Sequence, residues 1–236
     1  VAERWADRNA RKLLDQRAMQ DEDGISRATA LRALAQNWPD QSTRELLEQH
    51  AVHDEDYETR RAALRTLCEK WPDQNTRELL QERAVQDEVV FPRRAALRGL
   101  VENWPDQNTR DLVEERAVHD EDGFPRSVAL WALAEIWPDD STREILHQRA
   151  LQDEDYEPRR TALQALAEIW PDENTRELLQ QRVANDENAY VRGAVFVAIA
   201  ENWPDQETRE MLEQRAVKDE DSDARRFAIR ALATTW

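Results

Sequence analysis

Glycine, methionine and cysteine are scarce in this chain of 236 residues, which contains four, two and one of them respectively. Few glycines leave few positions for tight turns that need a positive φ. A single cysteine excludes an internal disulfide and any site built from several thiolates. The fold must therefore be held together by packing and by polar pairing.

Long apolar runs are also missing. No segment approaches the roughly 18 consecutive apolar residues of a membrane helix, and no basic segment followed by an apolar one opens the sequence. We expect a soluble, cytoplasmic protein that does not contact a membrane. Because 33 basic and 50 acidic side chains give a net charge of −17, the overall field opposes binding to nucleic acid.

Tryptophan recurs every 33 residues and defines the architecture. Seven full repeats follow from this period, between a short tail of a preceding repeat and Trp236, which begins a truncated one. The repeats are 5–37, 38–70, 71–103, 104–136, 137–169, 170–202 and 203–235, with residues 1–4 as the tail. Repeats 38–70 and 71–103 share 21 of 33 residues, so one physical arrangement is used seven times in one continuous domain.

Each repeat contains two stretches whose apolar residues follow the helical period, separated by an acidic turn. In the second repeat we expect helices at about 42–53 and 57–70, the first opening with a capping box from Ser42 to Glu45. Such hairpins cannot bury both apolar faces alone and must stack on one another. The prediction is an all-α solenoid, a right-handed α-α superhelix of seven helical hairpins.

An Asp near the end of each first helix is followed six positions later by an Arg in the second helix. With this pair, the chain resembles HEAT-like repeats of the short type that is grouped with phycobilisome-lyase repeats. The resemblance implies that Asp and Arg form a hydrogen-bonded ladder between successive repeats. The pairs are Asp21/Arg27, Asp54/Arg60, Asp87/Arg93, Asp120/Arg126, Asp153/Arg159, Asp186/Arg192 and Asp219/Arg225.

The Trp-Pro-Asp opening of the repeats is also similar to arrays attached to bacterial NACHT/STAND signalling NTPases. No phosphate-binding glycine loop occurs in the chain, so the chain would be the sensor array of such a protein and not its ATPase. The sequence begins with the last four residues of one repeat and ends on the first residue of another. We therefore expect a segment of a longer protein or an engineered protein.

No residues in the sequence form a candidate catalytic site. The four histidines, at 50, 53, 119 and 147, are too scattered for a zinc site, and the acidic turns lack the alternating ligands and the glycine of an EF-hand loop. Cys68 replaces a small inward residue and is expected to be inert core. We expect a protein that is not an enzyme and needs no cofactor or metal.

The second helices carry the candidate binding surface. The family resemblance places them on the concave side, and the charges separate accordingly: repeat positions 20–33 sum to +8 over the seven repeats, against −25 for positions 1–19. An exposed row of side chains on the second helices has arginine at several of its positions, and Trp131 replaces that arginine in the middle repeat. An exposed tryptophan between arginines is typical of a binding hot spot. The predicted binding residues are Arg61, Arg65, Arg94, Arg98, Val128, Trp131, Arg160, Val197, Arg226 and Arg230, with Gly193 and Ser127 as further members of the exposed row.

These features favour a non-catalytic protein–protein interaction scaffold that holds an acidic or extended polypeptide, as a monomer or with weak end-to-end association. Four alternatives stay open: a ligand-sensing array of a larger ATPase, a nucleic-acid-binding protein, a bilin lyase and a consensus scaffold without a native partner. One aromatic lies near each of five inter-helix turns, where we expect it to staple neighbouring repeats: Tyr57, Phe91, Phe124, Tyr156 and Tyr190.

Overall fold

The computed structural model describes residues 2–236, with their side chains from residue 8 onwards. These residues form fourteen α-helices and no strand, so the predicted all-α solenoid is confirmed. The helices are α1 (Ala2–Gln20), α2 (Gly24–Asn37), α3 (Gln41–His53), α4 (Tyr57–Lys70), α5 (Gln74–Gln86), α6 (Val90–Asn103), α7 (Gln107–His119), α8 (Gly123–Ile136), α9 (Asp140–Gln152), α10 (Tyr156–Ile169), α11 (Glu173–Asn185), α12 (Ala189–Asn202), α13 (Gln206–Lys218) and α14 (Ser222–Thr235).

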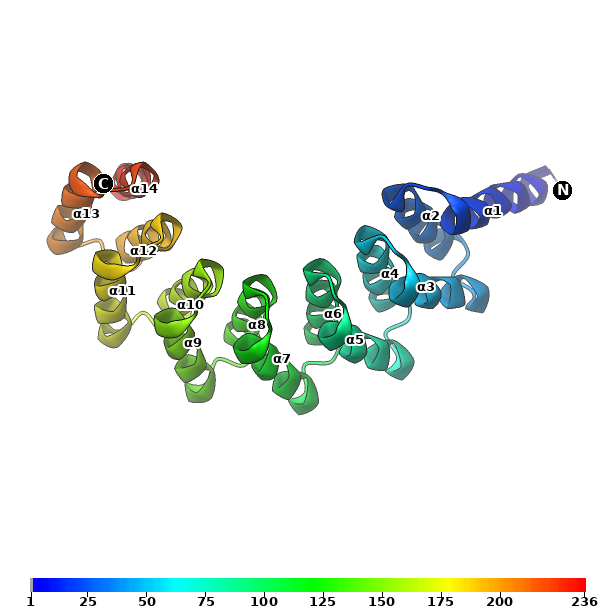
Figure 1. The fold of residues 1–236 in the computed structure, drawn as a ribbon, viewed down its shortest axis with the longest axis horizontal. Coiled ribbons are helices and arrows are strands. Elements are labelled where there is room, and N and C mark those ends of the chain that lie inside the picture. Colours follow the sequence, from blue (N-terminus) through cyan, green and yellow to red (C-terminus); the bar gives the residue numbers. More distant parts are fainter. Residues whose placement is uncertain (1) are drawn as a thin grey trace. The chain divides into compact units, whose positions relative to one another are not determined.

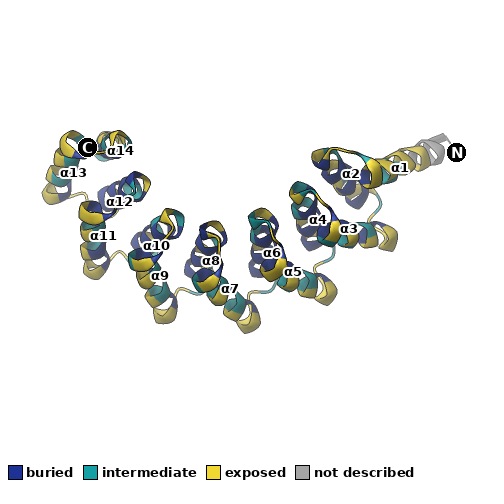
Figure 2. Cartoon of the chain, in the orientation of Figure 1, coloured by how far each residue is buried: buried dark blue, intermediate teal, exposed yellow. Residues whose placement is uncertain are grey.

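The chain divides into two compact units, which we call the N-terminal unit (Val1–Leu112) and the C-terminal unit (Val113–Trp236). Within each unit the second helices of successive hairpins pack directly on one another, α2 on α4 on α6 and α8 on α10 on α12 on α14. The first helices α1, α3, α5, α9, α11 and α13 pack mainly against the second helix of their own hairpin. In each unit the second helices therefore line the inner side of the stack (Figure 1) and contain most of the buried residues (Figure 2).

The same set of apolar residues is buried in successive hairpins. Leu47 and Ala51 of α3 are fully buried together with Leu64 and Leu67 of α4, as the helical spacing predicts. The equivalent residues of the other hairpins are buried in the same way, for example Leu80, Leu97 and Leu100. Each hairpin thus contributes a similar apolar stripe to both neighbours, which is why no single hairpin is expected to be stable alone.

The first helices begin one residue earlier than predicted, and their capping residue is a different one. Asp40, not Ser42, is the N-cap of α3, and its carboxylate accepts a hydrogen bond from the Thr43 amide at 3.0 Å. The Asp of Trp-Pro-Asp has the same role at α5, α9, α11 and α13. Ser42 is already inside the helix, so the expected capping box does not form.

The second helices are capped in two ways, depending on whether proline is the third helical residue. Asp56 caps α4 through the amides of Glu58 and Thr59, and Asn188 caps α12 similarly. At α6, α8 and α10 the third residue is proline and no side-chain cap forms. At α8 and α10 the proline lacks the N–H that such a cap would bind, and Asp155 instead accepts from Arg126 at 2.9 Å. At α6 the N-cap is Val89, which has no side-chain acceptor.

Tryptophan ends each second helix from α2 to α12, because the following proline disfavours helical geometry. Trp71, for example, adopts φ −136° and ψ 66°, and its amide still donates to the Leu67 carbonyl. In the first repeat Ala6 replaces this proline, and α1 runs through the position from Ala2 to Gln20. Residues 2–4 of the predicted tail are thus continuous with the first helix of the next repeat, and Val1 lies outside the described residues.

No helix in the described part of the chain has the length and apolar character needed to cross a membrane.

Gly99 of α6 and Cys68 of α4 form one complementary contact between neighbouring second helices. A Cβ added to Gly99 would collide with the Cys68 sulfur, so the glycine makes room for the larger residue of the preceding hairpin. Burial, with a smaller contribution from Glu102 and Glu69, raises the pKa of the Cys68 thiol to about 12. The thiol is therefore protonated and acts as a space-filling group.

We predict that Gly99→Ala lowers the free energy of unfolding by about 1–3 kcal/mol, because the added methyl overpacks the contact. In a Cys68→Ala background the same substitution should be neutral or stabilising, since alanine favours a helix over glycine by roughly 0.5–1 kcal/mol. Urea unfolding of the four proteins measures this coupling. Equal costs of Gly99→Ala in both backgrounds would show that the collision is not what requires glycine.

Candidate interaction surface

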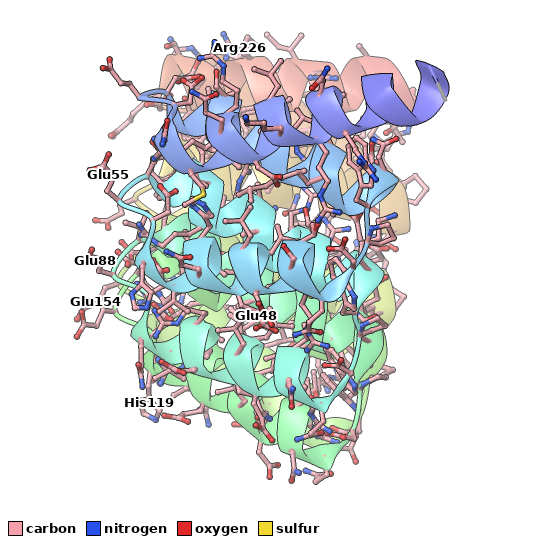
Figure 3. All side chains as sticks on the ribbon, turned by 90° about the vertical axis from the view of Figure 1, so that its right-hand side faces the viewer. Glu48, Glu55, Glu88, His119, Glu154 and Arg226 are labelled. Atoms are coloured by element: carbon pink, nitrogen blue, oxygen red, sulfur yellow. The ribbon has the colours of Figure 1, made fainter. Side chains whose placement is uncertain are left out.

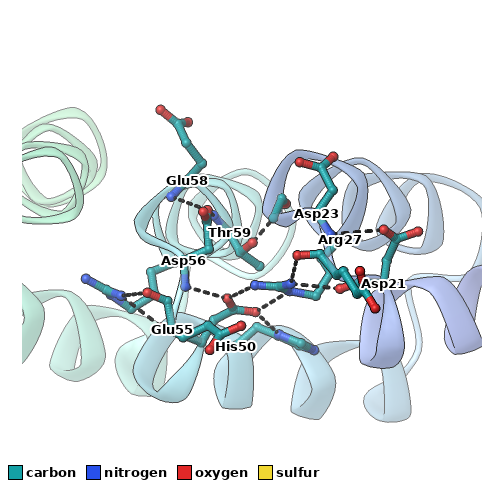
Figure 4. Close-up of polar contacts among 12 residues, drawn as sticks. Asp21, Asp23, Arg27, His50, Glu55, Asp56, Glu58 and Thr59 are labelled. Carbon is teal, nitrogen blue, oxygen red and sulfur yellow. Dashed lines mark hydrogen bonds and ion pairs between the residues drawn. The ribbon is translucent and has the colours of Figure 1, made fainter.

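The Asp and Arg of the predicted ladder join neighbouring inter-helix turns. Arg27 of α2 donates two hydrogen bonds to the carboxylate of Asp54 in the next hairpin, at 3.0 and 2.5 Å, and both side chains are buried (Figure 4). Its remaining nitrogen donates to the Asp21 carbonyl of its own turn at 2.8 Å. A planar guanidinium satisfies two turns at once in this way, which the compact ammonium of lysine would not.

The same bidentate pairing recurs within both units. Each acidic partner also accepts the backbone N–H two residues ahead, as Asp54 does from Asp56 at 2.9 Å, so it closes the turn that it anchors. The pairs are Arg27–Asp54 and Arg60–Asp87 in the N-terminal unit, and Arg126–Asp153, Arg159–Asp186 and Arg192–Asp219 in the C-terminal unit.

The other four predicted ladder residues have related environments. Arg93 and Arg225 donate to the backbone carbonyls of Asp87 and Asp219 in their own turns. Asp120 is buried and accepts the Asp122 amide. Asp21 accepts a hydrogen bond from the Asp23 amide and forms an ion pair with Arg17. The middle acidic residue of the turn also accepts from the ladder arginine through its backbone carbonyl, as Glu55 does from Arg60 at 3.3 Å. The side chains of Glu55 and Glu88 project outward from one edge of the N-terminal unit (Figure 3).

A second ladder, which the sequence reasoning missed, joins the first helices at their N-terminal ends. In four repeats the Arg of the Thr-Arg-Glu segment reaches the capping Asp of the next repeat, as Arg44 does with Asp73 at 2.5 and 2.9 Å. Arg11 occupies the same repeat position in the first repeat. The Asp therefore caps its own helix and binds the preceding one. Further pairs are Arg11–Asp40, Arg77–Asp106, Arg143–Asp172 and Arg176–Asp205. The signal was the constant spacing of 29 residues between these two positions.

In both ladders, contacts with the partner arginines lower the pKa of some of the carboxylates. Burial alone would raise the pKa of Asp54, but hydrogen bonds from Arg27 and His50 more than offset this and keep it below its ordinary value. At Asp219 burial is again the largest single effect and raises the pKa, but the hydrogen bonds from Arg192 and the Asp221 amide, together with the charges of Arg192 and Arg215, lower it overall. In the second ladder the guanidinium of Arg44 lowers the pKa of Asp73.

His50 occupies the position at which the other repeats have arginine. Its Nδ1 lies 2.7 Å from the Asp54 carboxylate, whereas Arg149, at the same position in its repeat, lies 3.7 Å from Asp153. The other three histidines are exposed. Among the described residues, no group of three or more His, Cys, Asp and Glu is arranged to hold a metal ion.

In the N-terminal unit, four predicted binding residues line one groove between α4 and α6, with a volume of about 390 Å³. These are Arg61, Arg65, Arg94 and Arg98. Arg61 pairs with Glu58, and Arg98 donates to Glu102 at 2.5 Å. Arg65 is exposed and makes no ion pair or side-chain hydrogen bond with any residue that the structure describes.

In the C-terminal unit, a second groove of about 530 Å³ crosses α10, α12 and α14 and contains Arg160, Val197 and Arg230. Arg160 is held by Glu157 and Gln164. Arg230 is exposed, and its side chain makes no polar contact within the described part of the chain. Arg226 pairs with Asp223 at 2.9 Å and does not line this groove.

Two members of the predicted exposed row are buried instead. Ser127 bonds to the Gly123 carbonyl. Gly193 lies against the Phe227 ring, with which any side chain at this position would collide. The absence of a side chain at Gly193 thus reflects packing against the next hairpin. Trp131 of α8 is 37% exposed, and Val128, one turn earlier, is half-buried.

The aromatic residues near the turns pair with one another between hairpins. The rings of Tyr57 and Phe91 stack with centroids 5.4 Å apart in the N-terminal unit. In the C-terminal unit, Tyr190 lies 6.1 Å from Tyr156 and 6.0 Å from Phe227, a residue that was not predicted to join them. Phe124 is exposed at the start of α8. The rings contact neighbouring hairpins, but they stay partly exposed and border the two grooves.

Comparisons with known proteins support the same fold. A family model described as HEAT repeats matches residues 10–100, 44–134, 111–200 and 176–235. A search of curated proteins found no match. The crystal structure of the Escherichia coli protein YibA is similar with a TM-score of 0.58 and 20% identity, over 96% of this chain and 82% of that one. The complex of CpcE and CpcF of phycocyanin lyase from Nostoc sp. PCC7120 has a TM-score of 0.47 and 17% identity, over 96% and 94%.

We predict that Arg159→Ala lowers the free energy of unfolding by about 3–5 kcal/mol, because the buried carboxylate of Asp186 loses both guanidinium hydrogen bonds and keeps a distant ion pair with Arg182 at 3.8 Å. The neighbouring Arg160→Ala is the matched control. It removes only a partly exposed pair with Glu157, so it should cost less than about 1 kcal/mol. Thermal or urea unfolding distinguishes the two, and similar costs would show that the ladder contributes no more than a surface ion pair.

Stability should fall in acid because the native state lowers the pKa of Asp54 and Asp219. Their contribution is complete above the ordinary carboxyl pKa of about 4 and is lost as the pH falls through the lower native values. We predict that Asp219→Asn reduces stability at pH 7 and flattens its decline below about pH 4. Glu220→Gln, at an exposed neighbour, should leave the pH profile unchanged, and identical profiles for both variants would contradict the assignment.

Proposed function

Because the chain belongs to the HEAT-repeat family, we propose that it is a non-catalytic scaffold that binds an extended polypeptide along its second helices. The observation that carries this proposal is the presence of uncommitted arginines on these helices. Arg65 and Arg230 line grooves and pair with no described residue, whereas the ladder arginines are buried in bidentate pairs. A guanidinium that the fold does not use is available for a carboxylate of a partner.

The charge distribution supports a partner with some acidic character. Second-helix segments carry +8 in total, while first helices and turns carry −25. A ligand carboxylate is therefore favoured beside the second helices and repelled by the rest of the surface. This gradient directs binding to one side of each hairpin without any need for a deep pocket.

Trp131 supports the same surface independently. It interrupts the arginine row of the second helices and remains 37% exposed, although a tryptophan is costly to leave in water. Exposed tryptophan and arginine are the residues that most often dominate binding energy at protein interfaces. The family match carries no information on catalysis, so the absence of enzymatic activity is part of the proposal. The link to NACHT/STAND signalling NTPases stays a prediction.

The proposal is tested by selecting peptides from an unstructured display library against the whole chain and titrating the best binder. Trp131→Ala should weaken a binder on the C-terminal unit by about tenfold or more, and Arg65→Ala should do the same for a binder on the N-terminal unit, as hot-spot truncations do. Arg209→Ala, which removes an exposed pair with Glu213 on α13, is the control and should leave the affinity unchanged. Melting curves must show that the variants stay folded. Failure to select any binder, or equal affinity for all variants, would contradict the proposal.

A further inference from the structure

The groove of the C-terminal unit differs in chemistry from that of the N-terminal unit. Four arginines and one aromatic ring line the N-terminal groove, whereas Tyr156, Tyr190 and Phe227 line the C-terminal one together with Arg160 and Arg230. We propose that the C-terminal groove binds a proline-rich segment in the polyproline II conformation that carries a single carboxylate. This inference rests on the proposed function and specifies the ligand of one part of the same surface.

The three rings follow one another along the groove, with Tyr190 between Tyr156 and Phe227, and form an apolar strip. Their centroid distances of 6.1 and 6.0 Å set a path of roughly 12 Å, which is the length of about four residues in polyproline II. Tyr190, in the middle, is 49% exposed. Beyond the rings the floor consists of Gly193, Ala194 and Val197. Such a strip suits the flat, rigid pyrrolidine rings of proline better than a long side chain that needs enclosure.

Hydrogen-bonding capacity points to the same ligand. The Tyr190 hydroxyl and the Arg230 guanidinium make no hydrogen bond with any described residue, so the groove presents donors. The Glu157 carboxylate of this groove accepts hydrogen bonds from Arg160 at 2.5 Å and from the Tyr156 hydroxyl. The backbone N–H groups of an ordinary peptide would stay unpaired along the strip. A proline backbone has no N–H group and offers only carbonyl acceptors.

Arg230 defines where the carboxylate would lie. It stands one helical turn beyond Phe227 on α14, at the end of the aromatic strip. The uncommitted carboxylate of this groove, Glu201, lies eight residues after Gly193 on α12, about 12 Å away along the helix. Because the chain carries a net charge of −17, a strongly acidic segment would be repelled. One carboxylate beside the prolines fits this field better than a run of them.

Fluorescence polarisation with three labelled ten-residue peptides tests the inference on the whole chain. The first consists of prolines with one central glutamate, the second replaces the prolines by alanine, and the third replaces the glutamate by lysine. The first peptide should bind at least tenfold more tightly than either of the others. Equal affinity of the alanine peptide would overturn the inference, and so would absence of binding by all three.

Substitutions in the two grooves test where the proline peptide binds. Tyr190→Ala should weaken the proline peptide by about tenfold, and Tyr190→Phe by less, because it keeps the ring and loses only the hydroxyl donor. Arg230→Ala should abolish the preference for glutamate over lysine. Arg65→Ala, in the other groove, is the matched control and should change nothing. Unchanged binding by Tyr190→Ala would overturn the assignment.

Failure here is distinguishable from failure of the proposed function. If library-selected peptides bind and depend on Trp131 while the proline peptide does not bind, the scaffold function stands and the ligand assignment is wrong. If no peptide of any kind binds, both fail.

Discussion

A buried arginine that serves two turns is the interaction on which this fold depends. In five ladder pairs the guanidinium satisfies both the carboxylate of the next hairpin and the carbonyls of its own turn, as Arg60 does with Asp87 and Asp54. The desolvation of such a charge is compensated only when every donor finds its partner. The ladder therefore fixes the position of one hairpin on the next more strictly than apolar stripes of similar leucines and alanines would. The second ladder, through Arg44 and Asp73, fixes the other end of the first helices.

The repeat period, the two helices per repeat and the buried leucines could be predicted from the sequence because they follow from spacing within one repeat. The N-cap at Asp40 was mistaken because Ser42 and Asp40 are both good caps, and the Trp-Pro pair that ends the preceding helix determines which one is used. The second ladder and the Phe227–Gly193 contact join residues of different repeats. Such contacts become visible only when the hairpins are placed side by side.

The candidate surface could be predicted only in part. The row of arginines on the second helices was identified from the helical period, but the sequence did not reveal that Arg61 and Arg160 are held by glutamates while Arg65 and Arg230 are not. Nor did it separate the arginine-rich groove from the aromatic one. Identical repeats present identical surfaces, so partner selection must depend on the positions where the repeats differ. These include Trp131, Tyr190 and Phe227, which lie on second helices.

Hydrogen–deuterium exchange of the whole chain, alone and saturated with a selected peptide, most directly tests the claim that the second helices form the binding surface. We predict that the bound peptide slows exchange in second helices such as α4, α8 and α12 and leaves the first helices unchanged. Protection confined to first helices such as α3, α7 and α11 would contradict the account.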